Sequence, residues 1–532
     1  MTFSRRWMTS YAVTLVVAFA ALFLLTRSSI LPGDAVRYIN VATSGDIAEF
    51  HYGNPSHFLQ IPLSRVIWLV STSVGLPVSV MSAVLALALA GTLAAIVFIG
   101  LIAADLTGQR WAAWFAAILF GTSLHVWTQV NGEQYGLALG FLTAAIWCAL
   151  NGRPWWTAGL FALAMTAHAE FFLAGPVVLL AMWKSPITRG LSQREKITTV
   201  AATLAGAAVV ATAVVTTGTW AMGKWTTPAT FVSFISHIFS VDHAYTVARP
   251  EPFRALKGLM TALTAGGHVW RDVLTGRGAM ADPTFLILAT VALVVLLTTV
   301  WCVISARANR PLFLIGLVWL LPFHVLGNWW FESTVEKYHG GALAALVLLV
   351  TGGLVHVVSQ YSSRQGVVWC ATYLSLAALL NLTGAVWPMR VRGEERAWAE
   401  QQLRQLAAAD QGRAVFIACD AYPALVAAGV PYFRIRSFWN GPVAVVQETI
   451  RSWADARVAE GRRPYLVGRW CLPEEWITRW SQAPFDLAYL ATSFVLTPTN
   501  IVNIPLSETV ATNPNSWKQG DVIRLDPRSV SQ

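Results

Sequence analysis

The chain has 532 residues, of which 55% are hydrophobic and only 12% are charged, and its mean hydropathy is +0.54. These values exclude a soluble globular protein and predict an integral membrane protein. The formal net charge of +10 does not indicate nucleic acid as a partner, because the basic residues are scattered in short loops between apolar segments.

The first apolar run follows Arg5 and Arg6, and no small-x-small cleavage site comes after it, so we predict an uncleaved first transmembrane helix. Residues 55–77 are apolar but carry Arg65 in mid-run and prolines at both ends, which favours an interfacial helix over a span. Apolar runs long enough to cross a bilayer, or to form short paired helices, predict about eleven spans. They lie near 9–26, 78–104, 112–130, 135–150, 154–167, 171–183, 197–222, 283–305, 311–330, 341–359 and 367–387.

Basic residues predict the orientation of these spans. With a cytoplasmic N-terminus, every basic short loop lies inside: Arg110, Arg153, residues 184–196, Arg307 with Arg310, and Arg364. The outer segments are then 27–77, 128–136, 167–172, 223–282 and 328–341, and they hold most of the membrane-proximal acids and histidines. We therefore expect a multi-pass protein of a membrane such as the prokaryotic plasma (inner) membrane, with its work done on the extracytoplasmic side.

The chain divides into two predicted domains. Residues 1–387 form a polytopic α-helical domain, with long outer loops at 27–77 and 223–282. Residues 388–532 have ordinary polarity and continue outside the membrane as a small α/β domain, with strand-like runs "AVFIAC", "VPYFRI" and "PYLVG". Cys419 and Cys471 would share the oxidising outer compartment there, but two cysteines alone do not establish a bridge.

Ionisable residues near the membrane usually mark function. His168 and Glu170 fall where a helical hairpin turns, and Glu133 and Tyr135 lie at another outer turn. A purely interfacial role is an equal alternative for all four, since hairpin tips can be polar because they are wet. Asp34 follows a Pro-Gly turn and has a structural alternative too, as the N-cap of a helix over residues 35–42.

Several segments in order resemble one family of membrane enzymes. They are "PGDAVRY" after the first span, "YGNPSHFLQIPLSRVIWLVSTSVG", "ADLTGQRWAAWFAAILFGTS", "NGEQYGLAL", "AMTAHAEFFLAGPVVLL" and "ESTVEKYHGGALAALVLLVTGGL". Their order and sidedness over residues 9–387 resemble the GT-C superfamily of glycosyltransferases, of the protein mannosyltransferase and aminoarabinose transferase type. Two positions depart from the family pattern, since Lys337-Tyr338 stands where Arg-Tyr is common and Pro55 stands alone where a Pro-Pro pair is common.

The resemblance implies a GT-C-like fold and an enzyme of glycan biosynthesis in the cell envelope. Such an enzyme transfers a sugar from a polyprenyl-phosphate donor to an acceptor hydroxyl on a lipid, glycan or protein, with inversion. It implies Asp34 as the general base, with Lys337, Arg37 and Tyr338 at the donor phosphate. The substrate cavity would be lined by Glu133, Tyr135, His168 and Glu170. No metal ligand is assigned and no cofactor is certain, although a divalent metal stays open.

Two other functions compete with a transferase. A transporter or flippase of lipid-linked saccharides would meet similar substrates, but transporters usually carry charges or broken helices near the bilayer midplane and inverted repeats. We find no such repeat, and the charges gather at one face. An inactive relative that acts as a scaffold through its outer domain is the third alternative.

The predicted orientation can be tested with reporter fusions along the chain. Fusions after Arg153, Lys196 and Arg364 should report the cytoplasm, because these positions lie in basic loops. Fusions at Asn54, Asp242 and Gln532 should report the outer side. An outer-side signal at Lys196 would overturn the orientation, because that loop is the most basic of the short loops.

Overall fold

The computed structural model describes the chain as two compact units. Unit 1 comprises Met1–Ser28 and Arg37–Arg390, and unit 2 comprises Ser29–Val36 and Val391–Gln532. The described residues are 3–27, 33–44, 59–133, 135–221, 253–266, 283–327, 339–361, 363–387, 403–418, 432–434, 443–467, 494–499 and 522–527, with a few short stretches between them.

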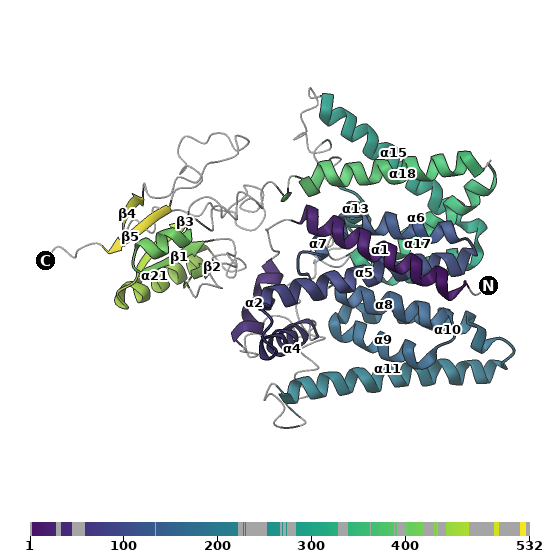
Figure 1. The fold of residues 1–532 in the computed structure, drawn as a ribbon, viewed down its shortest axis with the longest axis horizontal. Helices are drawn as coiled ribbons and strands as arrows, with labels where there is room; N and C mark the ends of the chain where they lie inside the picture. The colour runs from purple at the N-terminus through teal and green to yellow at the C-terminus, as the bar shows by residue number, and fades with distance from the viewer. Residues whose placement is uncertain are drawn as a thin grey trace. The chain divides into compact units, whose positions relative to one another are not determined.

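Unit 1 is built from helices of very different lengths, from single turns to α11 with 29 residues (Figure 1). Its first part contains α1 (Arg5–Thr26), α2 (Gly33–Ser44, whose first turn belongs to unit 2), α4 (Gln60–Ser73), α5 (Val80–Thr107), α6 (Arg110–Gly121), α7 (Leu124–Gln129), α8 (Tyr135–Leu150), α9 (Pro154–Ala167), η2 (Ala169–Ala174), α10 (Gly175–Lys184) and η3 (Pro186–Thr188). Its second part contains α11 (Gln193–Ala221), α13 (Arg254–Leu263), α15 (Pro283–Ser305), η5 (Ala306–Ala308), α16 (Arg310–Gly327), α17 (Gly340–Ser359), α18 (Ser363–Asn381) and the π-helical turn η7 (Leu382–Val386).

Each predicted span contains helix, and six helices among the described residues are long and apolar enough to cross a membrane. These six are Arg5–Thr26, Val80–Thr107, Gln193–Thr217, Pro283–Ala308, Gly340–Ser359 and Arg364–Val386. The predicted total of eleven therefore stays a prediction, because the remaining helices are shorter. The chain is a helical, polytopic membrane protein. The stretch predicted to be interfacial forms α4, which is not among the six.

The predicted span 112–130 is not one helix but two, α6 and α7. The break lies at Thr122 and Ser123, whose hydroxyls donate to the carbonyls of Ile118 and Phe120, 2.8 Å and 2.6 Å away. Such side-chain bonds occupy carbonyls at the end of α6 and offer the backbone an alternative to continuing the helix. The sequence pattern missed the break because both helices are apolar.

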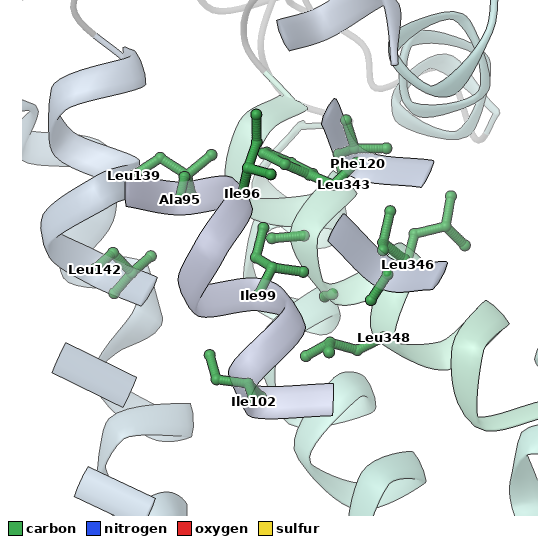
Figure 2. Packing of buried hydrophobic residues seen from close by; sticks show 14 of the residues in the cluster. Ala95, Ile96, Ile99, Ile102, Phe120, Leu139, Leu142, Leu343, Leu346 and Leu348 are labelled. Carbon is green, nitrogen blue, oxygen red and sulfur yellow. The ribbon is translucent and has the colours of Figure 1, made fainter. Parts of the chain in front are cut away.

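The core of unit 1 is centred on α17 and α5. In the most apolar window of α17, 83% of the residues are buried, against 67% in α5 and 11% in α11. Figure 2 shows α5 side chains Ile96, Ile99 and Ile102 packed among Phe120 of α6 and residues of α8 and α17. Protein therefore surrounds α5 and α17, whereas α11 leaves most of its apolar surface for lipid.

Small residues let the central helices approach closely, as is common in membrane proteins. A Cβ added at Gly91 of α5 would lie 2.3 Å from the Cα atom of Leu137 in α8, and one added at Gly353 of α17 would lie 1.7 Å from the carbonyl oxygen of Cys302 in α15. Backbone atoms cannot yield as a flexible side chain can. These two glycines are therefore required by helix packing.

Asn381, at the end of α18, connects three segments far apart in sequence. Its side chain is 1% exposed and accepts a hydrogen bond from the backbone N–H of Ala265, 2.7 Å away. Its amide nitrogen donates to the carbonyls of Thr122 (2.7 Å) and Leu263 (3.1 Å). One amide thus satisfies backbone groups at the ends of α6 and α13 that their own helices leave unpaired.

Unit 2 contains a five-stranded mixed sheet with the order β2-β1-β3-β5-β4. The strands β2 and β3 both pair parallel with β1, and β5 pairs antiparallel with β3 and β4. The three strand-like runs of the sequence are strands, whereas β4 and β5 were not predicted. The elements are β1 (Ala414–Ala418), β2 (Tyr432–Arg434), α21 (Val443–Ala459), β3 (Arg463–Val467), β4 (Phe494–Thr499) and β5 (Val522–Pro527).

A buried carboxylate fixes β3 at the turn before β1. Asp410 is 7% exposed and accepts hydrogen bonds from Arg463 (2.5 Å) and Tyr465 (3.2 Å). The adjacent Gln411 has a positive φ of 54°, which closes the turn between the helical residues 403–409 and β1. Cys419 and Cys471, whose pairing the sequence leaves open, lie outside the described residues.

Asn381 gives a test of the packing of unit 1. Asn381→Leu should lower the free energy of unfolding by about 2–5 kcal/mol, because each buried polar group left without its partner costs about 1–3 kcal/mol. The measurement is the melting temperature of the purified protein in detergent. Thr383→Ala is the matched control, since it removes a bond from the exposed Thr383 to Leu379 within one helix. Equal melting temperatures for the two variants would contradict the role of Asn381.

Candidate functional site

Consecutive helices of unit 1 run in alternate directions, so the turns between them gather at two ends of the bundle (Figure 1). One end carries the basic turns, with Arg110, Arg153, residues 184–196, Arg307 and Arg364. The other end holds α7, the start of α8, the end of α9, η2 and the start of α17. Tyr135, His168 and Glu170 therefore lie at the end opposite the basic turns.

Tyr135 and His168 form a buried aromatic pair. Tyr135 is the first residue of α8 and His168 directly follows α9, and their side chains are 2% and 3% exposed. The ring centroids are 4.0 Å apart with an interplanar angle of 34°. Phe171 meets both rings edge-on, at 6.4 Å and 5.9 Å. The sequence placed these residues at two separate turns, and the packing of α8 against α9 brings them together.

The hydrogen bond at Nδ1 of His168 orients its ring. The backbone N–H of Glu170 lies within hydrogen-bond distance of Nδ1, at 3.3 Å. This contact favours the tautomer that carries its proton on Nε2. Oε2 of Glu170 lies 3.9 Å from the same Nδ1 atom.

The carboxyl group of Glu170 is largely held away from water, with 14% of its side chain exposed. Burial raises the pKa of this group to about 8, and a hydrogen bond from Tyr135 opposes this rise only in part. Burial has this effect because it disfavours the charged form of a carboxyl group. Tyr135, His168 and Glu170 therefore form a compact group linked by a ring contact and hydrogen bonds.

Glu133 lies in the turn between α7 and α8 and is 1% exposed. Two buried glutamines hold this turn. Gln60 of α4 donates through Nε2 to the carbonyl of Gly132 (3.2 Å), and Oε1 of Gln129 accepts from the backbone N–H of Gly136 (3.1 Å). The structure thus places Glu133 beside the start of α8, in the turn that leads directly to Tyr135.

The residues predicted at the base and at the donor phosphate are only partly described. Asp34 lies in the first turn of α2, since the helix begins at Gly33 and not after Asp34. Arg37 lies one turn later in α2, and Lys337 and Tyr338 lie outside the described residues.

The helix that follows Lys337 and Tyr338 begins in a crowded place. His339 is 4% exposed, and α17 starts at Gly340 and Gly341. A Cβ added at Gly340 would lie 2.6 Å from Nε2 of the buried His125 in α7, and one added at Gly341 would lie 2.6 Å from the ring of Phe323 in α16. The two glycines thus allow α17 to begin directly against α7 and α16.

Sequence reasoning missed several polar residues of this end, among them His125, Gln60 and Gln129. Each lies inside an apolar stretch, and nothing in the sequence shows which way its side chain points. Arg65 stands out in the sequence as a charge in the middle of an apolar stretch. Such a charge suggests a polar partner on the backbone. Within the described ranges, no three histidine, cysteine, aspartate or glutamate side chains group closely enough to hold a metal ion.

The raised pKa of Glu170 predicts how the stability of the protein depends on pH. Its pKa of about 8 exceeds the ordinary value of 4.5, so the folded protein holds this proton more tightly than the unfolded chain does. The associated stability is fully present below pH 4.5 and is lost as the pH rises through 8. Glu170→Gln mimics the neutral acid, so its melting temperature should rise relative to the parent between about pH 5 and pH 9. The gain should be on the order of 1 kcal/mol or more, because one pKa unit is worth about 1.4 kcal/mol.

Glu195→Gln is the matched control for this measurement. Glu195 is exposed and accepts hydrogen bonds from the backbone and hydroxyl of Ser192, which lower the pKa of its carboxyl group. Its neutralisation should therefore act in the opposite direction at high pH. Parallel pH curves for the parent and Glu170→Gln would show that Glu170 is already ionised in the folded protein.

The chain was compared with known proteins by sequence and by structure. A scan against protein-family models and a search of curated protein sequences gave no match. The chain is similar to crystal structures of ArnT, an aminoarabinose transferase from Cupriavidus metallidurans. The apo state has a TM-score of 0.48 and the form bound to undecaprenyl phosphate a TM-score of 0.49, both with 13% identity, and they cover 96% and 97% of this chain and 98% of each matched chain.

It is also similar to the archaeal oligosaccharyltransferase AglB from Archaeoglobus fulgidus, in complex with an inhibitory peptide and a dolichol-phosphate. This match has a TM-score of 0.46 and 10% identity, and it covers 92% of this chain and 73% of the other. Both proteins are glycosyltransferases of the GT-C type, which is the type that the sequence resembles. All three TM-scores lie below 0.5, so the functional proposal rests on the residues of this chain.

Proposed function

We propose that the protein is an integral-membrane glycosyltransferase that moves a sugar from a polyprenyl-phosphate donor to an acceptor hydroxyl, with inversion. The transfer takes place at the end of the bundle opposite the basic turns. The acceptor is a lipid, glycan or protein, and the lipid tail of the donor stays in the bilayer while its head group is used at the surface.

One observation carries this proposal, namely the separation of two kinds of residue to the two ends of the helical bundle. Arginine and lysine mark the turns at one end, whereas the buried Glu133, Tyr135 and His168 and the partly buried Glu170 gather at the other. Surface loops that are merely wet do not require buried ionisable side chains. Burial of such groups at the edge of a membrane domain favours a site that handles a polar substrate.

The orientation of the site follows from the same separation. Basic turns of membrane proteins lie in the cytoplasm, so the end with Tyr135 and Glu170 faces the extracytoplasmic side. At the basic end, arginine also contacts aromatic rings. Arg110 lies 5.6 Å from the ring of Trp7 and 5.9 Å from that of Phe3.

The chemistry requires a base and a cation. The acceptor oxygen attacks the anomeric carbon and loses its proton to the carboxylate of Asp34. The bond from the anomeric carbon to the phosphate oxygen breaks, and polyprenyl phosphate leaves with the electron pair. Lys337, with Arg37 and Tyr338, stabilises the negative charge that develops on this phosphate.

The buried group at α8 and α9 has a different role in this proposal. Glu170, His168 and Tyr135 can donate and accept hydrogen bonds, and the raised pKa of Glu170 disfavours a negative charge near the developing phosphate. Such groups suit the hydroxyls of a sugar or of an acceptor, because a site built to bind a hydroxyl rejects analogues that lack it. They line the cavity and leave the proton transfer to Asp34.

The proposal predicts release of polyprenyl phosphate. The purified protein in liposomes, given a panel of polyprenyl-phosphate sugars and a membrane extract as the acceptor, should release polyprenyl phosphate detectable by mass spectrometry. Asp34→Asn should lower this release by about a hundredfold or more, because asparagine cannot accept the proton. Its melting temperature should fall only slightly, because loss of a negative charge from the first turn of a helix costs about 0.3–1 kcal/mol.

Other outcomes separate the alternatives. A flippase would move labelled donor across the bilayer without forming polyprenyl phosphate. Near-parent turnover by well-folded Asp34→Asn would remove Asp34 from catalysis. A loss of activity in proportion to a loss of stability would favour a structural role at the start of α2.

A further inference from the structure

We propose that Arg65 of α4 is a positioning residue that holds the carboxyl-terminal end of α2, the helix whose first turn carries Asp34. The catalytic consequence of this inference rests on the proposed function. The link between α4 and α2 rests on the hydrogen bonds from Arg65 to the backbone of α2. Arg65 would set the position of the helix that presents the base, without touching the substrate itself.

The contact joins a cation to the free carbonyls of a helix end. Nη1 of Arg65 donates to the carbonyl of Ala42 over 2.7 Å and lies 3.4 Å from that of Thr43. The last carbonyls of a helix have no partner within the helix. A positive charge there also interacts favourably with the negative end of the helix dipole. Arg65 therefore stabilises α2 at the end opposite Asp34.

The position of Arg65 explains an oddity of the sequence. It lies in the middle of an apolar run, between residues whose side chains are largely exposed in α4, such as Val66 and Leu69. A charge in such a run is unfavourable unless it has a polar partner. The backbone carbonyls of α2 supply that partner, and the ring of Trp68 in α4, 6.0 Å from the guanidinium, adds a second contact.

The opposite side of α4 is fixed to the bundle. Gln60 and Ser64 are fully buried, the hydroxyl of Ser64 donates to the carbonyl of Gln60 (2.8 Å), and Gln60 donates to Gly132 in the turn before α8. A helix anchored on one side at this turn can transmit a fixed position to a helix held on its other side. Through α4, the position of α2 is therefore fixed relative to the turn that carries Glu133.

The packing of α2 itself agrees with a helix held in one orientation. Ala35, Tyr38, Ile39 and Ala42 are each at most 7% exposed, and their spacing of three and four residues places them on one helical face. This face resists rotation about the helix axis but does not fix sliding along it. The bond from Arg65 to the last turn supplies that second restraint.

A simple membrane anchor is the competing role for Arg65. Arginine often lays its stem along apolar surface and keeps its charge at the lipid interface. An anchor needs only a positive charge, so lysine would replace it fully. A capping contact to two carbonyls needs the donors of a guanidinium, and lysine would replace it only in part.

The first experiment measures transfer and the mobility of α2 in Arg65→Ala, Arg65→Lys and the control Thr72→Ala. The hydroxyl of Thr72 donates to the carbonyl of Trp68 within α4. Its loss should therefore change neither the transfer rate nor the mobility of α2. Arg65→Ala should lower kcat by about tenfold to a hundredfold with KM nearly unchanged, as expected when a base is displaced by about 1 Å. Arg65→Lys should recover part of kcat, and the pH profile should keep its shape.

Hydrogen–deuterium exchange of residues 37–44 supplies a readout that does not depend on the reaction. The backbone amides of this last part of α2 should exchange faster in Arg65→Ala than in the parent, while those of α5 remain unchanged. Parent-like exchange, or full recovery of kcat by Arg65→Lys, would overturn the positioning role. If the parent protein releases no polyprenyl phosphate from any donor, the proposed function fails, and the exchange measurement still decides whether Arg65 holds α2.

Discussion

An ionised side chain is costly in the hydrocarbon interior of a bilayer, and the architecture of this protein depends on that constraint. The basic turns with Arg110, Arg153 and Arg307 lie at one end of the bundle, and Glu133, His168 and Glu170 lie at the other. The helices between them are packed by glycines and aliphatic side chains. Among the described residues, Tyr135, His168 and Glu170 meet at an end of the bundle and not between the helices.

Partial burial of Glu170 at that end favours the uncharged form of its carboxyl group. Burial raises the pKa of this group to about 8, and Nδ1 of the neighbouring His168 lies within hydrogen-bond distance of a backbone N–H. An uncharged carboxyl group avoids most of the desolvation penalty of a buried charge.

Polar side chains that bind helix ends recur in unit 1. Asn381 satisfies backbone groups of α6 and α13, and Arg65 satisfies carbonyls of α2. Gln129 accepts the N–H of Gly136 at the start of α8. Helix ends within or beside a membrane cannot rely on bulk water for these bonds. One side chain placed across a helix junction solves this problem and fixes the junction at the same time.

The sequence by itself determined the membrane class, the helical character of each predicted span and the division of charge between two sets of loops, because hydropathy and charge act over whole segments. It also identified Glu133, Tyr135, His168 and Glu170 as residues of outer turns. It could not show that α6 ends at Gly121, that the ring of Tyr135 packs against His168, or that Arg65 meets the carbonyls of Ala42 and Thr43. The last two contacts join residues 22 to 33 positions apart, and they depend on how helices pack, which periodicity along one segment does not encode. Only the tertiary structure decided them, because side-chain direction and helix-to-helix register are set by close packing in three dimensions.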